Sequence, residues 1–222
     1  EWLVGRMQVK FERTGEPGSA KIFIVTSDRP ANHAFERLFA SAGNVGVFYG
    51  ADANIPLRQL QCAKVNGITT IVSIDGDDIL CSPSAAAAVA AALDDGADYV
   101  RTAGLPFGMN AFGYRTDFLE KAVGQASATV LETGWGRIFD AGKLETISLG
   151  NWDQDHRLRM TLDYQEDAEF FTKVIEGLQD RVLQIGDEAL VDFVVSNKIY
   201  LLNENINDVY WENFNRQKNA ES

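Results

Sequence analysis

The stretch TTIVSIDGDDILCSPSAAAAVAAALDDGADYVRT, residues 69–102, decides the fold. Thr69–Asp75 is almost continuous in apolar and β-branched residues, a pattern typical of a parallel strand that is buried on both faces. Residues 82–96 are rich in alanine, with Ser82 or Ser84 as the helix cap and Gly96 after the last apolar residue. Residues 97–102 have the composition of another strand. The stretch therefore predicts a strand, a helix and a second parallel strand joined by a right-handed crossover.

The same alternation precedes this stretch. Lys21–Asp28 (KIFIVTSD) predicts a strand, and Pro30 opens an amphipathic helical pattern. Residues 46–50 (GVFYG) predict a short strand, and residues 55–67 (IPLRQLQCAKVNG) predict a helix that ends at Gly67. Repeated strands and helices with short connections indicate an α/β fold with an open, doubly wound and mostly parallel sheet.

The pattern is less regular after residue 101. Residues 102–115 (TAGLPFGMNAFGYR) are rich in glycine and aromatic residues and predict a small antiparallel excursion that shapes a pocket. Residues 158–163 (LRMTLD) predict a strand, and residues 164–178 (YQEDAEFFTKVIEGL) predict a strongly amphipathic helix. Residues 186–198 predict a further helix, followed by a polar tail rich in asparagine.

Composition limits the class of protein. The chain has 222 residues, 45% of them hydrophobic, which suits one sizeable core, so we expect residues 1–222 to form a single domain. Its 20 basic and 32 acidic residues give a formal charge of −12, which argues against nucleic acid as a partner. The longest apolar run, residues 85–93, is far shorter than the ~20 residues of a membrane span, so we expect no membrane insertion. Two cysteines without metal-ligand spacing fit a reduced, cytoplasmic setting.

Acidic residues follow the strand that we expect to be the most buried. Asp75, Asp77 and Asp78 lie in the sequence IDGDDIL, at the carboxyl end of that strand. In open parallel sheets, ligands bind at the carboxyl ends of strands. Clustered carboxylates suit Mg²⁺ or Mn²⁺, and such an ion neutralises phosphate charge. The alternative is that these aspartates only solvate a turn.

A second acidic group favours the metal site. Asp163 ends the predicted strand at residues 158–163 and is a plausible second metal ligand. Glu166 and Asp167 fall in the first turn of the next helix, where acidic residues favour the helix dipole and cap free amides, and this structural role is their leading interpretation.

The two acidic stretches together carry a family resemblance. Residues 72–100, followed by residues 158–175, resemble the cytidylyltransferases of the spore-coat polysaccharide, CMP-Kdo synthetase and CMP-acylneuraminate synthetase group. In that family one strand ends in a Gly-Asp pair that supplies a metal-binding aspartate, which matches Asp77, and a later strand supplies a second, which matches Asp163. The sequence IVTSDRP, which contains Asp28, and the initial EWLVGRM also resemble family segments.

The chain departs from the family pattern in three places. Tyr164-Gln165 stands where the family has Thr-Pro, and Ile79 stands where it has a proline. The family also begins with a strand and a basic, Gly/Ser-rich phosphate loop, and nothing here matches that loop. We therefore expect these residues to be part of a longer protein, with roughly 25 residues of strand and loop absent. Without that strand, its two neighbours in the sheet would keep unpaired backbone groups.

The resemblance implies a reaction and its participants. Asp77 and Asp163 would hold Mg²⁺ (or Mn²⁺) against CTP, with Asp75 and Asp28 assisting, while a substrate hydroxyl attacks the α-phosphorus and pyrophosphate leaves. The acceptor would be a small acidic sugar. For its pocket we select Asn110, Trp135 and Arg137, which lie in polar-aromatic loops. Their structural alternatives are a turn residue, a core residue and a surface ion pair.

Other functions remain open from the sequence. A nucleotide-sugar glycosyltransferase could use Asp75-Gly76-Asp77 as an Asp-x-Asp metal site. A degenerate family member that binds nucleotide without catalysis is a third interpretation. The sequence also leaves open whether the chain forms a homodimer.

Overall fold

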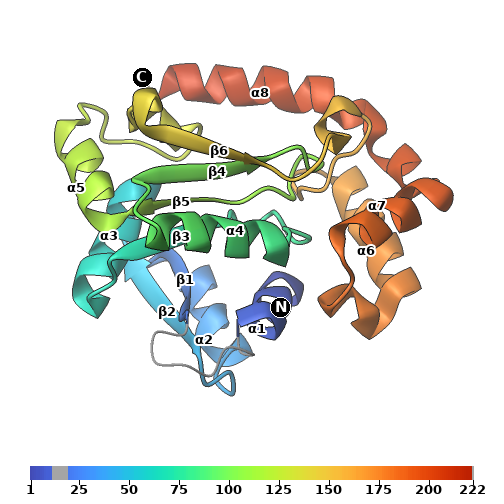
Figure 1. Ribbon diagram of the computed structural model, residues 1–222, viewed down its shortest axis with the longest axis horizontal. Coiled ribbons are helices and arrows are strands. Elements are labelled where there is room, and N and C mark those ends of the chain that lie inside the picture. Colours follow the sequence, from blue (N-terminus) through green and yellow to red (C-terminus); the bar gives the residue numbers. More distant parts are fainter. Residues whose placement is uncertain (12–19, 222) are drawn as a thin grey trace.

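The computed structural model describes residues 1–11 and 20–221 (Figure 1). The first half of the chain forms α1 (Trp2–Phe11), β1 (Ile22–Ser27), η2 (Pro30–His33), α2 (Ala34–Leu38), β2 (Val45–Gly50), α3 (Ile55–Asn66), β3 (Thr70–Ser73) and α4 (Pro83–Asp94), where η marks a 3-10 helix. The middle forms β4 (Tyr99–Ala103), β5 (Phe112–Arg115), α5 (Thr116–Gln125), η3 (Trp135–Ile138), η4 (Ala141–Lys143), β6 (Leu144–Ser148) and η5 (Trp152–Gln154). The last part forms α6 (Gln165–Leu178), η6 (Gln179–Leu183), α7 (Asp187–Ser196), η7 (Ile199–Leu202), η8 (Glu204–Ile206) and α8 (Asn207–Ala220).

The strands form two sheets. One contains four strands in the order β3-β5-β4-β6, and the other is the parallel pair β1-β2. Strand β5 runs antiparallel to both β3 and β4, while β6 runs parallel to β4. The α/β fold and its antiparallel excursion are therefore confirmed, since β5 runs against the other strands of its sheet. Within the described residues, no backbone ladder joins β1 to β3.

Local sequence explains where the main helices begin and end. Helix α4 starts at Pro83, and the Ser82 hydroxyl accepts a 3.0 Å hydrogen bond from the Ala85 amide, which caps the helix. Helix α3 is capped in the same way by Asn54, whose side chain accepts from the Leu57 amide at 2.9 Å. It ends at Gly67, whose φ of 64° lies in the left-handed region that glycine adopts most readily.

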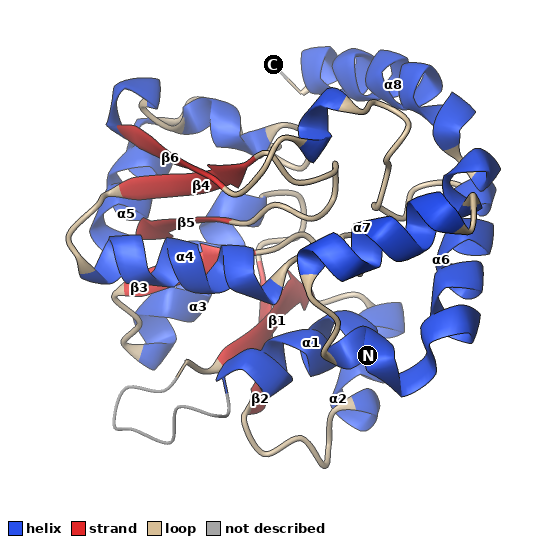
Figure 2. Cartoon of the chain, turned by 45° about the vertical axis from the view of Figure 1, so that its right-hand side comes forward, coloured by secondary structure: helices blue, strands red, loops and turns tan. Residues whose placement is uncertain are grey.

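Helices cover both faces of the sheet. Helix α4 lies in front of the four-stranded sheet in Figure 2 and contributes Val89 and Leu93 to the larger apolar cluster, which also contains Val100 of β4 and Phe170 of α6. A second cluster contains Leu60 of α3, Tyr114 of β5, Leu119 of α5 and Trp135, among others. Within the described residues, no helix is long and apolar enough to cross a membrane.

Two expectations about single elements are wrong. Residues 158–163 form no ladder strand; they are an extended segment with one isolated bridge, from Arg159 to Phe107, because they run between loops. Strand β3 is not the most buried strand, since Ile71 and Val72 are only half-buried and one edge of β3 has no ladder partner among the described strands. The sequence predicted no element for the polar tail, and most of this tail forms α8, which lies along the top of the view in Figure 1.

Candidate functional site

A tight acidic loop follows β3. Backbone amides of Asp78 and Ile79 donate to the carbonyls of Asp75 and Asp77, at 3.1 and 2.9 Å, and these bonds turn the chain back on itself. One ligand oxygen from each of Asp75, Asp77 and Asp78 lies within 4.8 Å of the others. The side chains are half-buried. The turn therefore gathers the carboxylates predicted to hold a metal ion.

The second acidic segment is hydrogen-bonded to this loop. The Leu162 amide donates to the Asp77 carbonyl at 3.0 Å, and the Met160 amide donates to the Phe107 carbonyl at 2.7 Å. The Thr161 hydroxyl donates to Asp163 at 3.3 Å. The structure thus brings the predicted metal ligands Asp77 and Asp163 into one region, although Asp163 is not among the carboxylates that lie within the 4.8 Å group.

Burial and mutual repulsion change the acidity of this group. Burial, with the nearby charge of Asp77, raises the pKa of Asp75 to about 6. Burial, followed by the charges of Asp77 and Asp75, raises the pKa of Asp78 to about 8. Burial and the charge of Asp163 also raise the pKa of Asp77. Crowded carboxylates of this kind fit a divalent cation, which would offset their repulsion with hard oxygen ligands that Mg²⁺ prefers.

A fully buried arginine holds the second acidic segment in place. The Arg159 guanidinium has no exposed area and donates to Asp163 at 2.5 Å and to Asp167 at 2.9 Å. Asp167 in turn accepts from the amides of Asp163 and Tyr164, both at 3.0 Å, and from the Asn203 side chain at 2.8 Å. Asp167 therefore caps α6, as expected, and also neutralises a buried cation.

Sequence reasoning missed Arg159 as part of the site. The sequence feature that pointed to it was a single basic residue within LRMTLD, a segment that we interpreted only as a strand. A cation in such a segment has to find an acidic partner when it is buried, so the neighbouring Asp163 and Asp167 were its natural partners.

Helix α8 adds aromatic side chains next to the acidic residues. The rings of Tyr210 and Trp211 lie 5.3 and 5.4 Å from the ring of Phe107, and the Arg159 guanidinium lies 4.4 Å from the Tyr210 ring centre. Burial, followed by the charge of Asp163, raises the pKa of Tyr210. Trp211 remains 45% exposed. These aromatic residues also escaped sequence reasoning, because the tail was interpreted only as polar and rich in asparagine.

The other predicted site residues lie in different surroundings. Asp28 is exposed and pairs with His33 at 2.8 Å. Asn110 donates to the Leu105 carbonyl at 3.1 Å and accepts from the Thr102 hydroxyl at 3.3 Å, which are the contacts of a turn residue. Their predicted ligand-binding roles stay predictions.

Trp135 and Arg137 lie together in η3. Trp135 is 6% exposed, and its ring centre lies 5.2 Å from that of Phe112 in the second apolar cluster. Arg137 donates to the Thr133 carbonyl and lies 3.6 Å from the Glu221 carboxylate. Both side chains thus have partners within the protein, and their roles in acceptor binding also stay predictions.

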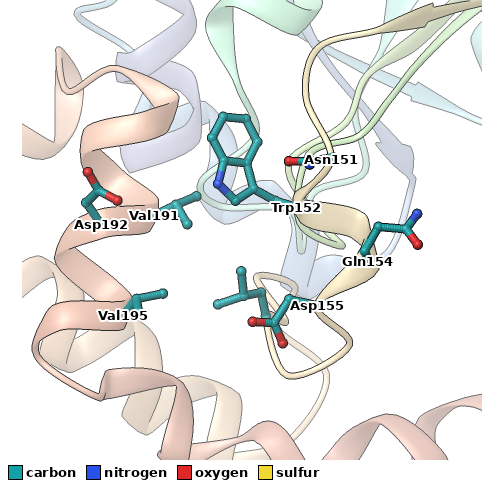
Figure 3. A pocket seen from close by; sticks show the side chains of 8 residues that line it. Asn151, Trp152, Gln154, Asp155, Val191, Asp192 and Val195 are labelled. Atoms are coloured by element: carbon teal, nitrogen blue, oxygen red, sulfur yellow. The ribbon is translucent and has the colours of Figure 1, made fainter.

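Two cavities that described residues line lie near other elements. The larger, about 480 Å³, lies between α7 and residues 151–158, and Figure 3 shows Trp152, Val191 and Val195 around it. Its lining contains none of the clustered aspartates, so we do not assign the chemistry to it. The smaller, about 180 Å³, lies between β1 and β3.

Two solved structures resemble the fold of this chain. No protein-family model and no curated protein matches this chain. A cytidylyltransferase from Leptospira borgpetersenii serovar Hardjo-bovis (strain JB197) is similar in structure, with a TM-score of 0.70 and 18% identity over 90% of this chain and 86% of that one. The 4-diphosphocytidyl-2C-methyl-D-erythritol synthase of Anaerococcus prevotii DSM 20548 is also similar, with a TM-score of 0.52 and 13% identity over 78% of this chain and 86% of that one. At these identities the likeness establishes the fold alone.

Proposed function

We propose that this chain is a divalent-metal-dependent nucleotidyltransferase that joins CMP from CTP to a sugar acid or a related small acceptor and releases pyrophosphate. The observation that carries the proposal is the group of Asp75, Asp77 and Asp78, within 4.8 Å, hydrogen-bonded through its loop to the segment of Asp163. This group lies at the carboxyl end of β3, where ligands bind in α/β sheets. The fold shared with a cytidylyltransferase supports the same reading.

The metal ion that we propose is Mg²⁺ (or Mn²⁺). Asp77 and Asp163 are its proposed protein ligands, and Asp75 and Asp78 supply further negative charge. When bound, such an ion neutralises charge on the phosphates of a nucleotide. The net charge of −12 supports the proposal, since an acidic protein without a bound cation would repel a triphosphate.

The chain's own residues contribute orientation. Arg159 fixes the Asp163 carboxylate from the buried side, which leaves the other oxygen of that carboxylate for a ligand. The ring of Trp211 is partly exposed beside Phe107 and Tyr210, where it offers an apolar face for a nucleotide base or the acceptor. We place substrate binding between this aromatic face and the acidic loop.

Nucleotidyl transfer is favoured over glycosyl transfer by a specific observation. An Asp-x-Asp pair alone would serve a nucleotide-sugar glycosyltransferase, but here a second acidic segment reaches the same loop through the hydrogen bond from Leu162 to Asp77. The two reactions differ in their products, because only nucleotidyl transfer from CTP releases pyrophosphate.

The test is a pyrophosphate-release assay on the full-length protein. The four common nucleoside triphosphates are each combined with a panel of sugar acids and Mg²⁺. We expect release with CTP and one acidic acceptor, and a loss of about 100-fold or more in Asp77→Asn, because charge stabilisation carries most of such a rate.

Asp94→Asn is the matched control. Asp94 is exposed at the end of α4, so its substitution should leave the rate unchanged. Full activity in Asp77→Asn would overturn the metal site. Transfer from a nucleotide sugar without pyrophosphate release would favour the glycosyltransferase, and nucleotide binding without turnover would favour a non-catalytic protein.

A further inference from the structure

The cavity between α7 and residues 151–158 has no part in the proposed nucleotide chemistry (Figure 3). Its volume of about 480 Å³ falls within the range of about 300–1,000 Å³ that is usual for small-molecule sites. The buried side chains of Leu158 and Val191 belong to its lining. The cavity therefore has the size and the apolar surface that an organic ligand needs.

Close backbone packing holds the aromatic wall of this cavity in place. The Trp152 amide donates to the Gly104 carbonyl at 2.7 Å. Gly150 packs directly against the indole, and a Cβ atom at this position would overlap the ring. Figure 3 shows the half-buried ring between Val191 and Asn151. The indole is thus a preformed surface that a ligand would not have to order on binding.

The charged side chains in the lining are carboxylates. Asp155 is already paired with Arg157, whose guanidinium donates to its two oxygens at 2.7 and 2.8 Å. Asp192 is exposed on α7, and no hydrogen bond or ion pair joins it to another described residue. No basic side chain among the described residues of the lining would offset the charge of an anionic ligand. The unpaired carboxylate therefore selects a cation.

The apolar part of the lining distinguishes an organic cation from a metal ion. A divalent metal ion needs several oxygen ligands, and Asp192 is the one lining carboxylate without a partner among the described residues. An indole, such as that of Trp152, is the aromatic group that attracts cations best. Val195, at the edge of the cavity, is 39% exposed and adds apolar surface that a ligand would cover.

We propose that this cavity binds a small organic ammonium ion, with its nitrogen at Asp192 and its apolar body against Trp152 and Val191. The side-chain amides of Asn151 and Gln154 offer further oxygen acceptors for the ammonium protons. Because the clustered aspartates do not line this cavity, the proposal does not depend on nucleotidyl transfer.

Isothermal titration calorimetry tests the proposal with four probes that separate the charge from the apolar body. Phenylpropylamine carries both, phenylpropanol lacks the charge, phenylpropanoate reverses it, and methylammonium lacks the body. At low salt, which limits screening, we expect phenylpropylamine to bind about fivefold or more tightly than each of the other three. This order follows if the ion pair and the apolar contact act on one molecule.

Three variants locate the bound amine. Asp192→Asn keeps the shape of the side chain and removes its charge, so it should weaken phenylpropylamine binding by about threefold or more and leave phenylpropanol unchanged. Glu188→Gln is the matched control, because Glu188 is exposed on the same helix outside the lining, and it should bind phenylpropylamine normally. Asp77→Asn should also bind it normally, which separates this cavity from the acidic loop.

Several outcomes would overturn the proposal. Equal affinities for phenylpropylamine and phenylpropanol, or equal losses in Asp192→Asn and Glu188→Gln, would show that Asp192 does not recognise the charge. Loss of amine binding in Asp77→Asn would place the amine at the acidic loop, and absence of binding up to the solubility limit would leave the cavity without this ligand. None of these measurements uses nucleotide turnover, so failure of the proposed enzymatic activity would not affect them.

Discussion

Arg159 is a fully buried charged residue next to the candidate site. Its guanidinium is fully buried and ion-paired with Asp163 and with Asp167, which is also fully buried. Removing one member of a buried pair leaves the other charge without compensation. We therefore expect Arg159→Met to lower the free energy of unfolding by about 3–5 kcal/mol in urea titrations.

Arg157 provides the matched control for this substitution. It lies two positions away in the sequence and pairs with Asp155 at 2.7 Å, but its side chain is 55% exposed. An exposed pair contributes about 1 kcal/mol or less, so Arg157→Met should have a small effect. Equal losses in the two variants would show that burial of the Arg159 pair does not stabilise the fold.

The sequence predicted the acidic residues of the site better than their partners. Asp75, Asp77 and Asp163 could be found because they follow apolar segments, and carboxylates after buried strands suggest ligand binding. The burial of Arg159 could not be predicted, because it depends on Asn203 and Tyr210, which lie far along the chain and reach it only in the folded state. Local patterns carry no record of such long-range contacts.

At the scale of elements, the loop between β4 and β5 positions the second acidic segment. Gly108 has φ of +88°, and a Cβ atom there would lie 2.2 Å from the Met160 carbonyl oxygen. The close approach allows the Met160 amide to donate to the Phe107 carbonyl at 2.7 Å. Only glycine permits both this conformation and this contact.

Gly108→Ala should therefore destabilise the protein. The left-handed φ alone costs about 1–2 kcal/mol for alanine, and displacement of the backbone at Met160 adds to this loss. We expect a lower melting temperature by differential scanning calorimetry, together with weaker Mg²⁺ binding because Asp163 follows the displaced segment.

Gly124→Ala tests whether any added methyl group has this effect. Gly124 lies within α5, where a Cβ atom would meet nothing within 4 Å, so alanine should be neutral or stabilising by about 0.5–1 kcal/mol. An unchanged melting temperature in Gly108→Ala would mean that the loop moves aside without loss.

Helices whose caps and composition are encoded in neighbouring residues could be predicted from the sequence, whereas elements held by distant contacts could not. Helix α4 combines a serine cap, a proline in its first turn and an alanine-rich body, so the sequence limited its cap to Ser82 or Ser84, and the structure has Ser82. Helix α8 has no buried residue and a polar composition, and it is held by the contacts of Tyr210 and Phe214 with distant parts of the chain. The expected strand at residues 158–163 failed for a similar reason, since its neighbours are loops and offer no ladder.

For the whole molecule, the acidic group makes stability depend on pH. Asp75 and Asp78 have pKa values of about 6 and about 8 in the folded protein, above those of unfolded aspartates. The folded state therefore binds more protons, and the free energy of unfolding should fall as pH rises from about 5 to about 8. Asp77 and Asp163 face the same group, and their negative charges raise the pKa of Asp78 further.

Divalent cations should restore the free energy of unfolding that is lost as the pH rises. We expect saturating Mg²⁺ to raise the free energy of unfolding more at about pH 8 than at about pH 5, because ionised carboxylates bind the ion. Urea titrations at both pH values measure the effect, and Asp78→Asn should reduce both the pH dependence and the response to Mg²⁺.

Asp155→Asn is the control for the dependence of stability on pH. The Arg157 side chain lowers the pKa of Asp155, so Asp155 is ionised in both states across this range and its substitution should leave the slope unchanged. A stability that rises from pH 5 to pH 8 without Mg²⁺ would contradict the raised pKa values.

The division of the sheet also has a mechanical consequence. Within the four-stranded sheet, each pair of neighbouring strands is joined by backbone hydrogen bonds, which resist a pulling force; β4 and β6, for example, pair at Tyr99 and Leu144. Between β1 and β3 no backbone ladder of the described residues resists the force, and helix α3 packs against β1 there. A load applied along the direction of the backbone hydrogen bonds would therefore separate β1 and β2 from the other four strands first.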